Sequence, residues 1–400
     1  MGSVTQAVAI NLPPLLFVTF QNEYGLTLER LGFLTTANFV LQMVVDLVAS
    51  RFGNRMNFRF SSVLATAAAT LGFLALVVLP GWLPDPFAAL LLATVLLSLG
   101  EGLIEVVVTP VLDAIPEKSP GAISLLHSFY CWGSMSVSLL STLFFVLCRV
   151  TRWRWLVLLW GLVPLTTTLL FLFVPMPTPK SGAVIAGEES RRNPLGQLLR
   201  RRVFWMLMLL MVCAGVAELS ISNWASLFAE AGLQVSKTTG DLLGPCLFAF
   251  LMGVARVVLS RIKNMKQLYS RLFFCAVGCV GGYLLTVFAP TPLLSLLGIG
   301  VCGFCVGIMW PGVLSLATDL FPRAGTGMFA CLALCGDIGC SVGPLLVGVI
   351  SQNMTAGGTD TLAALQGGLL VVAIFPLVMS IVTRLLRRES RRMASAEKGR

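Results

Sequence analysis

Of the 400 residues, 56% are hydrophobic and only 12% are charged, and the mean hydropathy is +0.89. A soluble domain carries roughly 25% charged residues, so this composition excludes one and indicates an integral membrane protein. The net charge of +10 does not indicate nucleic-acid binding, because the basic residues lie in short segments between apolar runs, where they act as topological signals.

Apolar runs recur along the whole chain, each near the ~20 residues that carry a helix across a membrane, whereas barrel strands would alternate and be about half as long. We therefore expect an all-α membrane protein. Twelve transmembrane helices are predicted, at residues 4–22, 29–50, 59–80, 86–112, 119–148, 153–174, 203–229, 238–260, 267–289, 292–318, 324–351 and 361–385.

A polar segment at residues 175–202 divides these helices into two sets of six. It is rich in proline and charged residues and cannot bury enough apolar surface to pack, which is typical of a linker. The predicted organisation is a six-helix bundle at 1–174, a cytoplasmic linker, a second six-helix bundle at 203–385 and a basic cytoplasmic tail at 386–400. With both termini inside, the inward segments carry 23 of the 28 Lys and Arg residues, so the orientation is strongly specified.

Two short matches relate each helix to the one six places later. Gly133 and Gly339 each lie 17 residues after a proline that ends the fourth or the tenth span. Residues 45–52 align without gaps to residues 255–262. We therefore expect two halves related in parallel by a pseudo-two-fold axis along the membrane normal, with the working site between them near the midplane.

Two carboxylates and the single histidine lie inside the fourth and fifth spans. Charge at bilayer depth costs several kcal/mol, so Glu101, Glu105 and His127 are candidate functional residues. Glu101 and Glu105 are four residues apart on one helix face, where both cannot ionise easily, and we expect the pair to hold a proton and titrate as a unit. Alternatively, each is a structural residue. His127 could relay a proton, bind solute or be a satisfied core residue.

The seventh span carries a second group, Glu218 with Asn223 and Trp224. Asn can bond sugar hydroxyls, and an indole face can stack on a pyranose, although Trp224 could instead belong to an interfacial aromatic belt. Asp337 in the eleventh span is a further acid, either for ion coupling or as a structural hydrogen-bond acceptor. The expected solute-binding residues are Asn11, His127, Tyr130, Asn223, Trp224 and Trp310.

Residues 46–55, DLVASRFGNR, resemble the loop signature between helices 2 and 3 of the major facilitator superfamily, and the resemblance covers essentially the whole chain. Residues 217–224 and 102–110 are similar to the fucose-permease branch of sugar:cation symporters. Members of that branch have a coupling acid on helix 1, where this chain offers only Asn11.

Four charged residues at the inner ends of the second and eighth spans are expected to lie too far from the midplane to touch solute. Asp46, Arg51 and Arg55 suit an ion pair between helices that closes the cytoplasmic side in one state. Arg256 stands where the repeat would place the acid, so the predicted cytoplasmic gate is asymmetric. The alternative is that these charges only orient the chain.

These features predict a secondary active transporter that imports a small polar solute, a sugar, by alternating access. Glu101, Glu105, Glu218 and Asp337 would couple transport to H⁺ or Na⁺. The alternatives are a proton-antiport exporter of amphipathic compounds and a non-transporting membrane sensor.

The residues show no catalytic constellation, so we expect no enzyme. We also expect no cofactor, and no metal site because there is one histidine. The expected partners are the solute and the lipid bilayer, with no nucleic acid. A multi-pass monomer of the cell membrane, such as a bacterial inner membrane, is expected.

Overall fold

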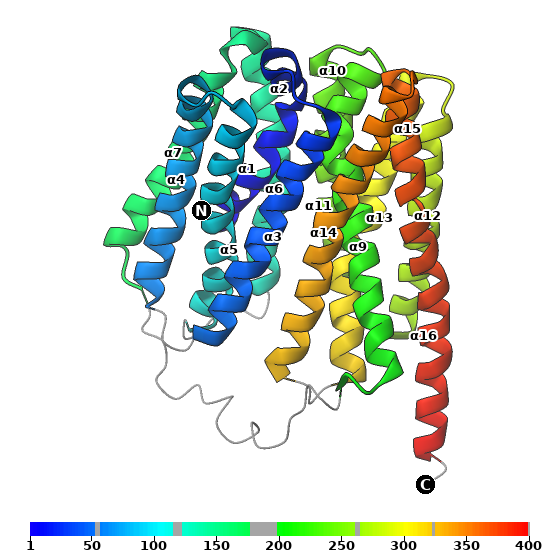
Figure 1. Ribbon diagram of the computed structural model, residues 1–400. Helices are drawn as coiled ribbons and strands as arrows, with labels where there is room; N and C mark the ends of the chain where they lie inside the picture. The colour runs from blue at the N-terminus through cyan, green and yellow to red at the C-terminus, as the bar shows by residue number, and fades with distance from the viewer. Residues whose placement is uncertain (53–56, 115–121, 177–197, 261–264, 322–324, 399–400) are drawn as a thin grey trace.

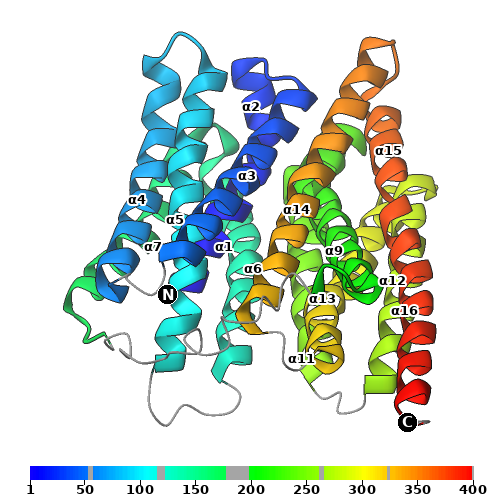
Figure 2. The same cartoon turned by 60° about the horizontal axis from the view of Figure 1, so that its bottom comes forward.

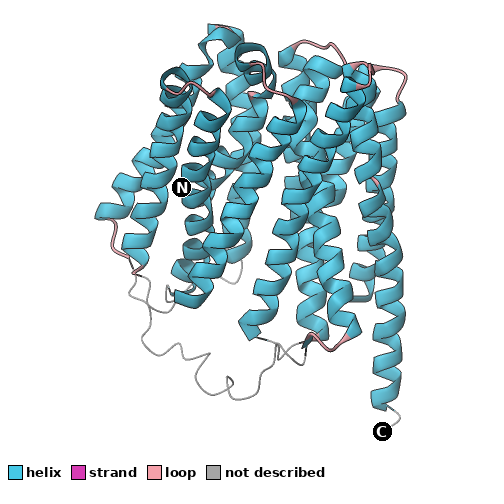
Figure 3. Ribbon diagram, viewed as in Figure 1, coloured by secondary structure: helices cyan, strands magenta, loops and turns pink. Residues whose placement is uncertain are grey.

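The computed structural model describes residues 1–52, 57–114, 122–176, 198–260, 265–321 and 325–398, and every regular element in these ranges is a helix (Figures 1 and 3). In chain order they are α1 (Gly2–Leu15), α2 (Phe17–Tyr24), α3 (Leu28–Phe52), α4 (Phe58–Trp82), α5 (Pro86–Ala114), α6 (Ala122–Cys148), η2 (Val150–Arg152), α7 (Trp153–Phe173), α9 (Arg202–Leu227), η4 (Phe228–Gly232), α10 (Lys237–Asp241), η5 (Leu242–Cys246), α11 (Leu247–Ser260), α12 (Met265–Phe288), α13 (Pro292–Leu320), α14 (Gly325–Ala356), α15 (Thr361–Val372) and α16 (Ile374–Lys398).

The predicted α-helical membrane architecture is confirmed. Within the described residues, ten spans are long and apolar enough to cross a membrane, and α1 and α2 together form an eleventh candidate that is bent by 48°. Helix α3 has a similar length of 25 residues and packs against α5 and α14, but several of its side chains lie outside the described part of the structure and it is not among these ten spans. The count of twelve spans therefore stays a prediction.

The bend between α1 and α2 follows from two consecutive prolines. Pro13 and Pro14 lie near the end of α1, and a proline inside a helix removes a backbone donor and clashes with the preceding turn. The Leu16 N–H bonds to the Pro13 carbonyl at 3.0 Å, a tighter turn than the α-helix makes. The last residue of α1, Leu15, consequently presents its carbonyl at a helix end, where such groups need other donors.

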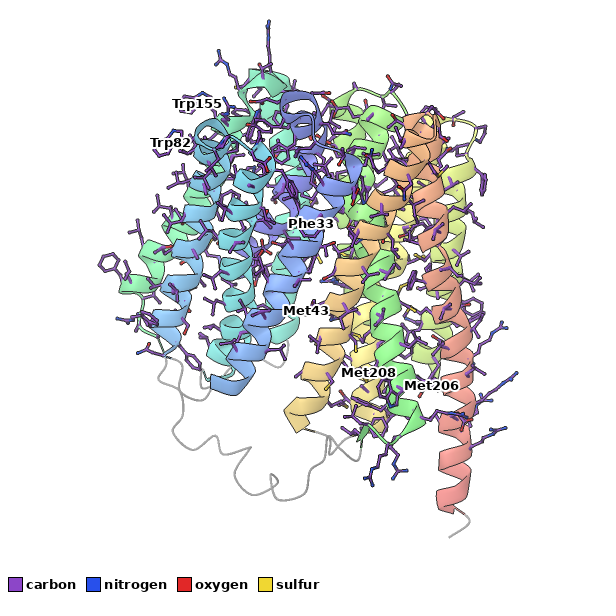
Figure 4. The ribbon with its side chains drawn as sticks, in the orientation of Figure 1. Phe33, Met43, Trp82, Trp155, Met206 and Met208 are labelled. Atoms are coloured by element: carbon purple, nitrogen blue, oxygen red, sulfur yellow. The ribbon has the colours of Figure 1, made fainter. Side chains whose placement is uncertain are left out.

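Short connections cluster at one end of the bundle, which we name the short-loop face (top of Figure 1). The loops at this face are residues 25–27, 83–85, 233–236, 289–291 and 357–360. The opposite end, where α7 ends and α9 begins, is named the linker face. Trp82 and Trp155 project outward toward the short-loop face (Figure 4) and are 81% and 64% exposed, as expected for tryptophans at a membrane interface.

Figure 2 shows α1–α7 on one side of the molecule and α9–α16 on the other. Helix α3 packs along α14, and α6 along α11. The Leu28 N–H bonds to Gln352 Oε1 at 3.0 Å, and Thr36 Oγ1 donates to the Ser341 carbonyl at 2.9 Å. A Cβ on Gly348 would lie 2.8 Å from the Leu28 carbonyl oxygen, so α3 and α14 approach closely because this residue is glycine. The two groups of helices are thus in close contact toward the short-loop face.

The last helix continues past residue 385, the predicted end of the twelfth span. Helix α16 runs to Lys398, so the predicted basic tail is helical as far as the structure describes it. Arginine is a good helix former, and pairs three residues apart support a helix. Arg392 and Glu389 form such a pair at 3.1 Å. Most of the predicted linker, residues 177–197, lies outside the described residues.

Candidate functional site

A cavity lies between the two groups of helices, with walls from α1–α6 on one side and from α9, η5 and α11 on the other. Its volume is about 60 Å³, and since each water needs about 10–15 Å³ of such space, it holds a few water molecules in this conformation. Its polar lining consists of Asn11, Thr35, Asn38, Thr94, Tyr130, Ser134, Ser138, Glu218, Ser222, Asn223 and Ser226.

Two amide–carboxylate pairs join α3 to α5. Asn38 Nδ2 donates to Glu101 Oε2 at 2.9 Å, and Gln42 Nε2 donates to Glu105 Oε2. Both amides and both acids are spaced four residues apart, so one face of each helix meets the other twice. Gln6 Nε2 of α1 donates a further bond to Glu105 Oε2 at 2.9 Å.

The two carboxylates differ in their access to water. Glu101 is fully buried, whereas Glu105 is exposed. Ser98 Oγ donates to Asn38 Oδ1 at 2.6 Å, and Asn38 lines the cavity, so Glu101 is separated from the cavity by one side chain. Among the described residues, no Lys or Arg lies within ion-pair distance of either acid. Protonation of these carboxylates therefore breaks no described ion pair.

An acid–base pair joins α9 to α11. Glu218 lines the cavity, and its Oε1 lies 3.9 Å from Arg256 Nη2. Arg256 is predicted from the sequence to belong to the cytoplasmic gate. Its side chain lies next to Glu218 and to Met252 Sδ, the latter at 3.8 Å. Arg256 follows Met252, a cavity-lining residue, by one helical turn, which places both on one face of α11. Its Nε is buried and has no hydrogen-bond partner within the described ranges.

Asn223 and Trp224 have different surroundings, although they are adjacent in sequence. Asn223 lines the cavity, and its Oδ1 accepts a bond from Thr35 Oγ1 across the two groups of helices at 3.1 Å. Trp224 is fully buried, donates from Nε1 to the Pro344 carbonyl at 3.1 Å and packs edge-on against Phe17 with ring centroids 5.8 Å apart. In this conformation Trp224 does not line the cavity.

The other expected solute-binding residues divide in the same way. Asn11 and Tyr130 line the cavity, and Asn11 Nδ2 donates to the Ala7 carbonyl at 2.8 Å. Trp310 on α13 is partly buried, and Asp337 on α14 is 5% exposed. Neither lines the cavity.

The side chains of four predicted residues lie outside the described part of the structure. Of these residues, Asp46 and Arg51 belong to α3 and His127 to α6. Arg55 lies wholly outside the described residues. Their proposed roles in the gate or the solute site stay predictions.

A charged cluster that was not predicted from the sequence lies near the short-loop face. Lys237 Nζ of α10 donates to the Leu15 carbonyl at 2.8 Å, and lies 3.2 Å from Asp241 Oδ2 and 3.4 Å from Glu230 Oε2. Asp241 is fully buried, and its Oδ1 accepts a bond from Ser226 Oγ at 2.5 Å. The ammonium thus binds the negative end of α1 at its bend, and the cluster reaches the cavity through Ser226.

A family model described as Major Facilitator Superfamily matches residues 1–344, and a comparison with curated proteins finds no match. Among solved structures, a bacterial homolog of the human lysosomal transporter Spinster, in an inward-facing and occupied conformation, is 13% identical with a TM-score of 0.74, and the match covers 97% of this chain and 95% of that one.

The nucleoside transporter NupG is 11% identical with a TM-score of 0.73, and the match covers 96% of this chain and 98% of that one. The Escherichia coli fucose:proton symporter is 16% identical with a TM-score of 0.61, and the match covers 96% of both chains. At these identities the likeness concerns the fold alone.

Proposed function

We propose that this chain, which belongs to the major facilitator superfamily, is a proton-coupled transporter that imports a small polar solute, such as a sugar, by alternating access. The observation that carries the proposal is the cavity between the two groups of helices, whose polar lining comes from both groups. A solute bound there contacts both, as alternating access about a central site requires. The proposal includes twelve spans, two repeat-related halves and termini on the cytoplasmic side.

The proton is favoured over sodium by the groups that face the acids. Asn38 and Gln42 present amide N–H donors to Glu101 and Glu105, and a protonated or ionised carboxyl can keep such bonds. A sodium ion would instead require several oxygen ligands around it, as hard cations do. Glu105, which is exposed, exchanges the proton with water in this conformation. Glu101 is the buried member of the pair and titrates together with Glu105.

Glu218 and Asn223 are proposed to contact the solute on the side of α9. Asn223 Nδ2 is buried and has no hydrogen-bond partner in the described part of the chain, so it is a donor that a solute hydroxyl or carbonyl can satisfy. Because Glu218 and Arg256 are 3.9 Å apart, both side chains can make further hydrogen bonds, the carboxylate as acceptor and the guanidinium as donor. The proposed solute is therefore hydroxylated and polar.

The experiment is transport in proteoliposomes with the Glu105→Gln variant. A thermal-shift screen of sugars and nucleosides first identifies a solute that stabilises the purified protein. The variant should lose accumulation driven by an inward proton gradient but keep exchange of labelled for unlabelled solute, because exchange needs no net proton movement. Glu29→Gln, an exposed acid at the start of α3, is the matched control and should keep both activities.

Gradient-driven accumulation by Glu105→Gln at the wild-type level would contradict the coupling role. Accumulation that follows a sodium gradient and ignores pH would replace H⁺ by Na⁺. If neither uptake nor exchange of any solute can be measured with the wild-type protein, a sensor becomes the better interpretation.

An exporter of amphipathic compounds remains the second candidate, because part of the cavity wall is apolar. Phe17, Phe20, Phe39, Phe248 and Met252 contribute to this part, and aromatic and methionine side chains suit amphipathic ligands. Resistance of overexpressing cells to a panel of amphipathic cations separates the two: a polar-solute importer confers none.

A further inference from the structure

A second pocket lies on the outer surface of the bundle, between α12 and α16. Its volume is about 230 Å³. Two arginines, Arg384 and Arg387, line it together with the hydroxyl-bearing residues Tyr269 and Ser270 and the rings of Phe273 and Phe274. It has no residue in common with the central cavity.

Contacts with α12 hold both guanidinium groups at this pocket. The Arg384 guanidinium carbon lies 3.9 Å from the centroid of the Phe273 ring, and Arg387 Nη1 donates to Ser270 Oγ at 3.2 Å. The Tyr269 side chain is 6% exposed, and its hydroxyl lies near the Ser390 side chain of α16. A phenolic hydroxyl can donate one hydrogen bond and accept another, so this group can also bond a polar atom of a ligand in the pocket.

The charge of the pocket selects an anion. No carboxylate lines it, and in the described part of the chain neither Arg384 nor Arg387 has a carboxylate within ion-pair distance. Glu389, the acid of α16, pairs with Arg392 instead. Two planar guanidinium groups with free N–H donors match the oxygens of a phosphate group.

The depth of the pocket places it at the edge of the bilayer. Arg384 follows Thr361, the first residue of α15 at the short-loop face, by 23 residues, which corresponds to about 35 Å of helix. The hydrocarbon core is about 30 Å thick, so Arg384 lies where the core ends on the linker face. Figure 1 shows α16 continuing beyond the neighbouring helices at this end, and in Figure 4 nitrogen-tipped side chains project from its lower part away from the bundle.

The outward face of α16 changes from apolar to basic at the same depth. Ile374, Leu377, Ile381 and Leu385 are 41–56% exposed, and their helical spacing puts them in one stripe. Arg388 continues that stripe one turn later and is exposed. A stripe that faces lipid tails therefore leads directly to guanidinium groups at headgroup level.

We propose that this pocket binds the headgroup of an anionic phospholipid in the leaflet at the linker face. Arg384 and Arg387 donate to the phosphate oxygens, the Tyr269 hydroxyl bonds the headgroup, and the acyl chains lie along Phe274 and the apolar stripe of α16. Phe274 is 68% exposed, as a residue in contact with lipid tails should be. Basic pockets between membrane helices recognise anionic headgroups by this chemistry.

The test is thermal unfolding of the full-length protein in neutral detergent, titrated with dioctanoyl phosphatidylglycerol. This lipid should raise the Tm in a saturable way, whereas dioctanoyl phosphatidylcholine and inorganic phosphate at the same concentrations should not. One arginine near a membrane surface is worth roughly fivefold in affinity for anionic lipid. The Arg384→Gln/Arg387→Gln variant should therefore bind phosphatidylglycerol about 25-fold more weakly.

The matched control is Arg200→Gln/Arg201→Gln, which removes the same charge from exposed positions at the linker face outside the pocket. This control should bind within a few-fold of the wild type, and equal weakening of both double variants would show general electrostatic attraction and overturn the pocket. Stabilisation of the wild type by phosphatidylcholine or by inorganic phosphate to the same extent would overturn a lipid headgroup as ligand. If phosphatidylglycerol does not raise the Tm of the wild type, the proposal is overturned whatever the variants show. The test uses no transport measurement and is therefore independent of the proposed function.

Discussion

The charged cluster at the short-loop face leads to a prediction in which one substitution, Asp241→Asn, destabilises the wild type but stabilises a second variant. Lys237→Gln removes the ammonium from Asp241, whose carboxylate is fully buried and then keeps hydroxyl donors, Ser226 and Thr142, but no positive charge within ion-pair distance among the described residues. Asp241→Asn removes the charge instead and leaves Lys237 bound to Glu230 and to the Leu15 carbonyl. The first substitution leaves an uncompensated buried charge, and the second does not.

The magnitudes follow from what each variant leaves unpaired. Removing one partner of a buried ion pair costs about 3–5 kcal/mol, which we expect for Lys237→Gln. Asp241→Asn should cost about 1–3 kcal/mol, the range for a lost buried hydrogen-bond partner. In the Lys237→Gln background, the same Asp241→Asn change removes the stranded carboxylate and should restore about 1–3 kcal/mol.

The assay is a double-mutant cycle on the free energy of unfolding of the purified protein in one detergent. Asp241→Asn should destabilise the wild type and stabilise the Lys237→Gln variant. Asp360→Asn, an exposed acid before α15, serves as the control and should change stability by no more than about 0.5 kcal/mol. The reasoning is refuted if Asp241→Asn lowers the stability of Lys237→Gln as much as it lowers that of the wild type.

Two further predictions concern the contact between the two groups of helices. Gly348→Val should disfavour this conformation by about 1–3 kcal/mol, because even a Cβ would lie 2.8 Å from the Leu28 carbonyl oxygen. Spin labels placed on α3 and α14 at the short-loop face should then report longer distances between the two helices. An unchanged distance distribution would contradict the prediction. Trp224→Ala should lower the free energy of unfolding by about 3–5 kcal/mol, because the indole is fully buried. A raised KM for transport at unchanged stability would instead indicate that the indole stacks on the solute.

Part of the candidate site could be predicted from residue types alone. Glu101, Glu105 and Glu218 stand out because a carboxylate inside a long apolar run is costly and needs a local reason. The structure places Glu218 in the wall of the cavity and gives the other two acids amide partners. Asn38 and Gln42 were missed, although their spacing of four residues, the same as that of the two acids, was a signal in the sequence.

The surroundings of Arg256 and Trp224 could not be predicted, because both depend on which helix is the neighbour. A residue count places Arg256 near a helix end, but its partner Glu218 is on another helix whose rotation is set by packing. Trp224 follows Asn223 directly, yet successive residues on a helix point about 100° apart, so one faces the cavity and the other packs behind Phe17.

The sequence by itself determined that the protein is a bundle of membrane helices, because backbone groups in lipid must be satisfied within the helix and only long apolar runs meet that condition. It also determined where polar groups enter the membrane. Only the tertiary structure decided which of these groups meet: Lys237 with the freed end of α1, Arg256 with Glu218, and Arg384 and Arg387 with the start of α12. Hydropathy has no information on neighbours, since lipid and protein interiors are similarly apolar and helix packing depends on the shape of facing side chains.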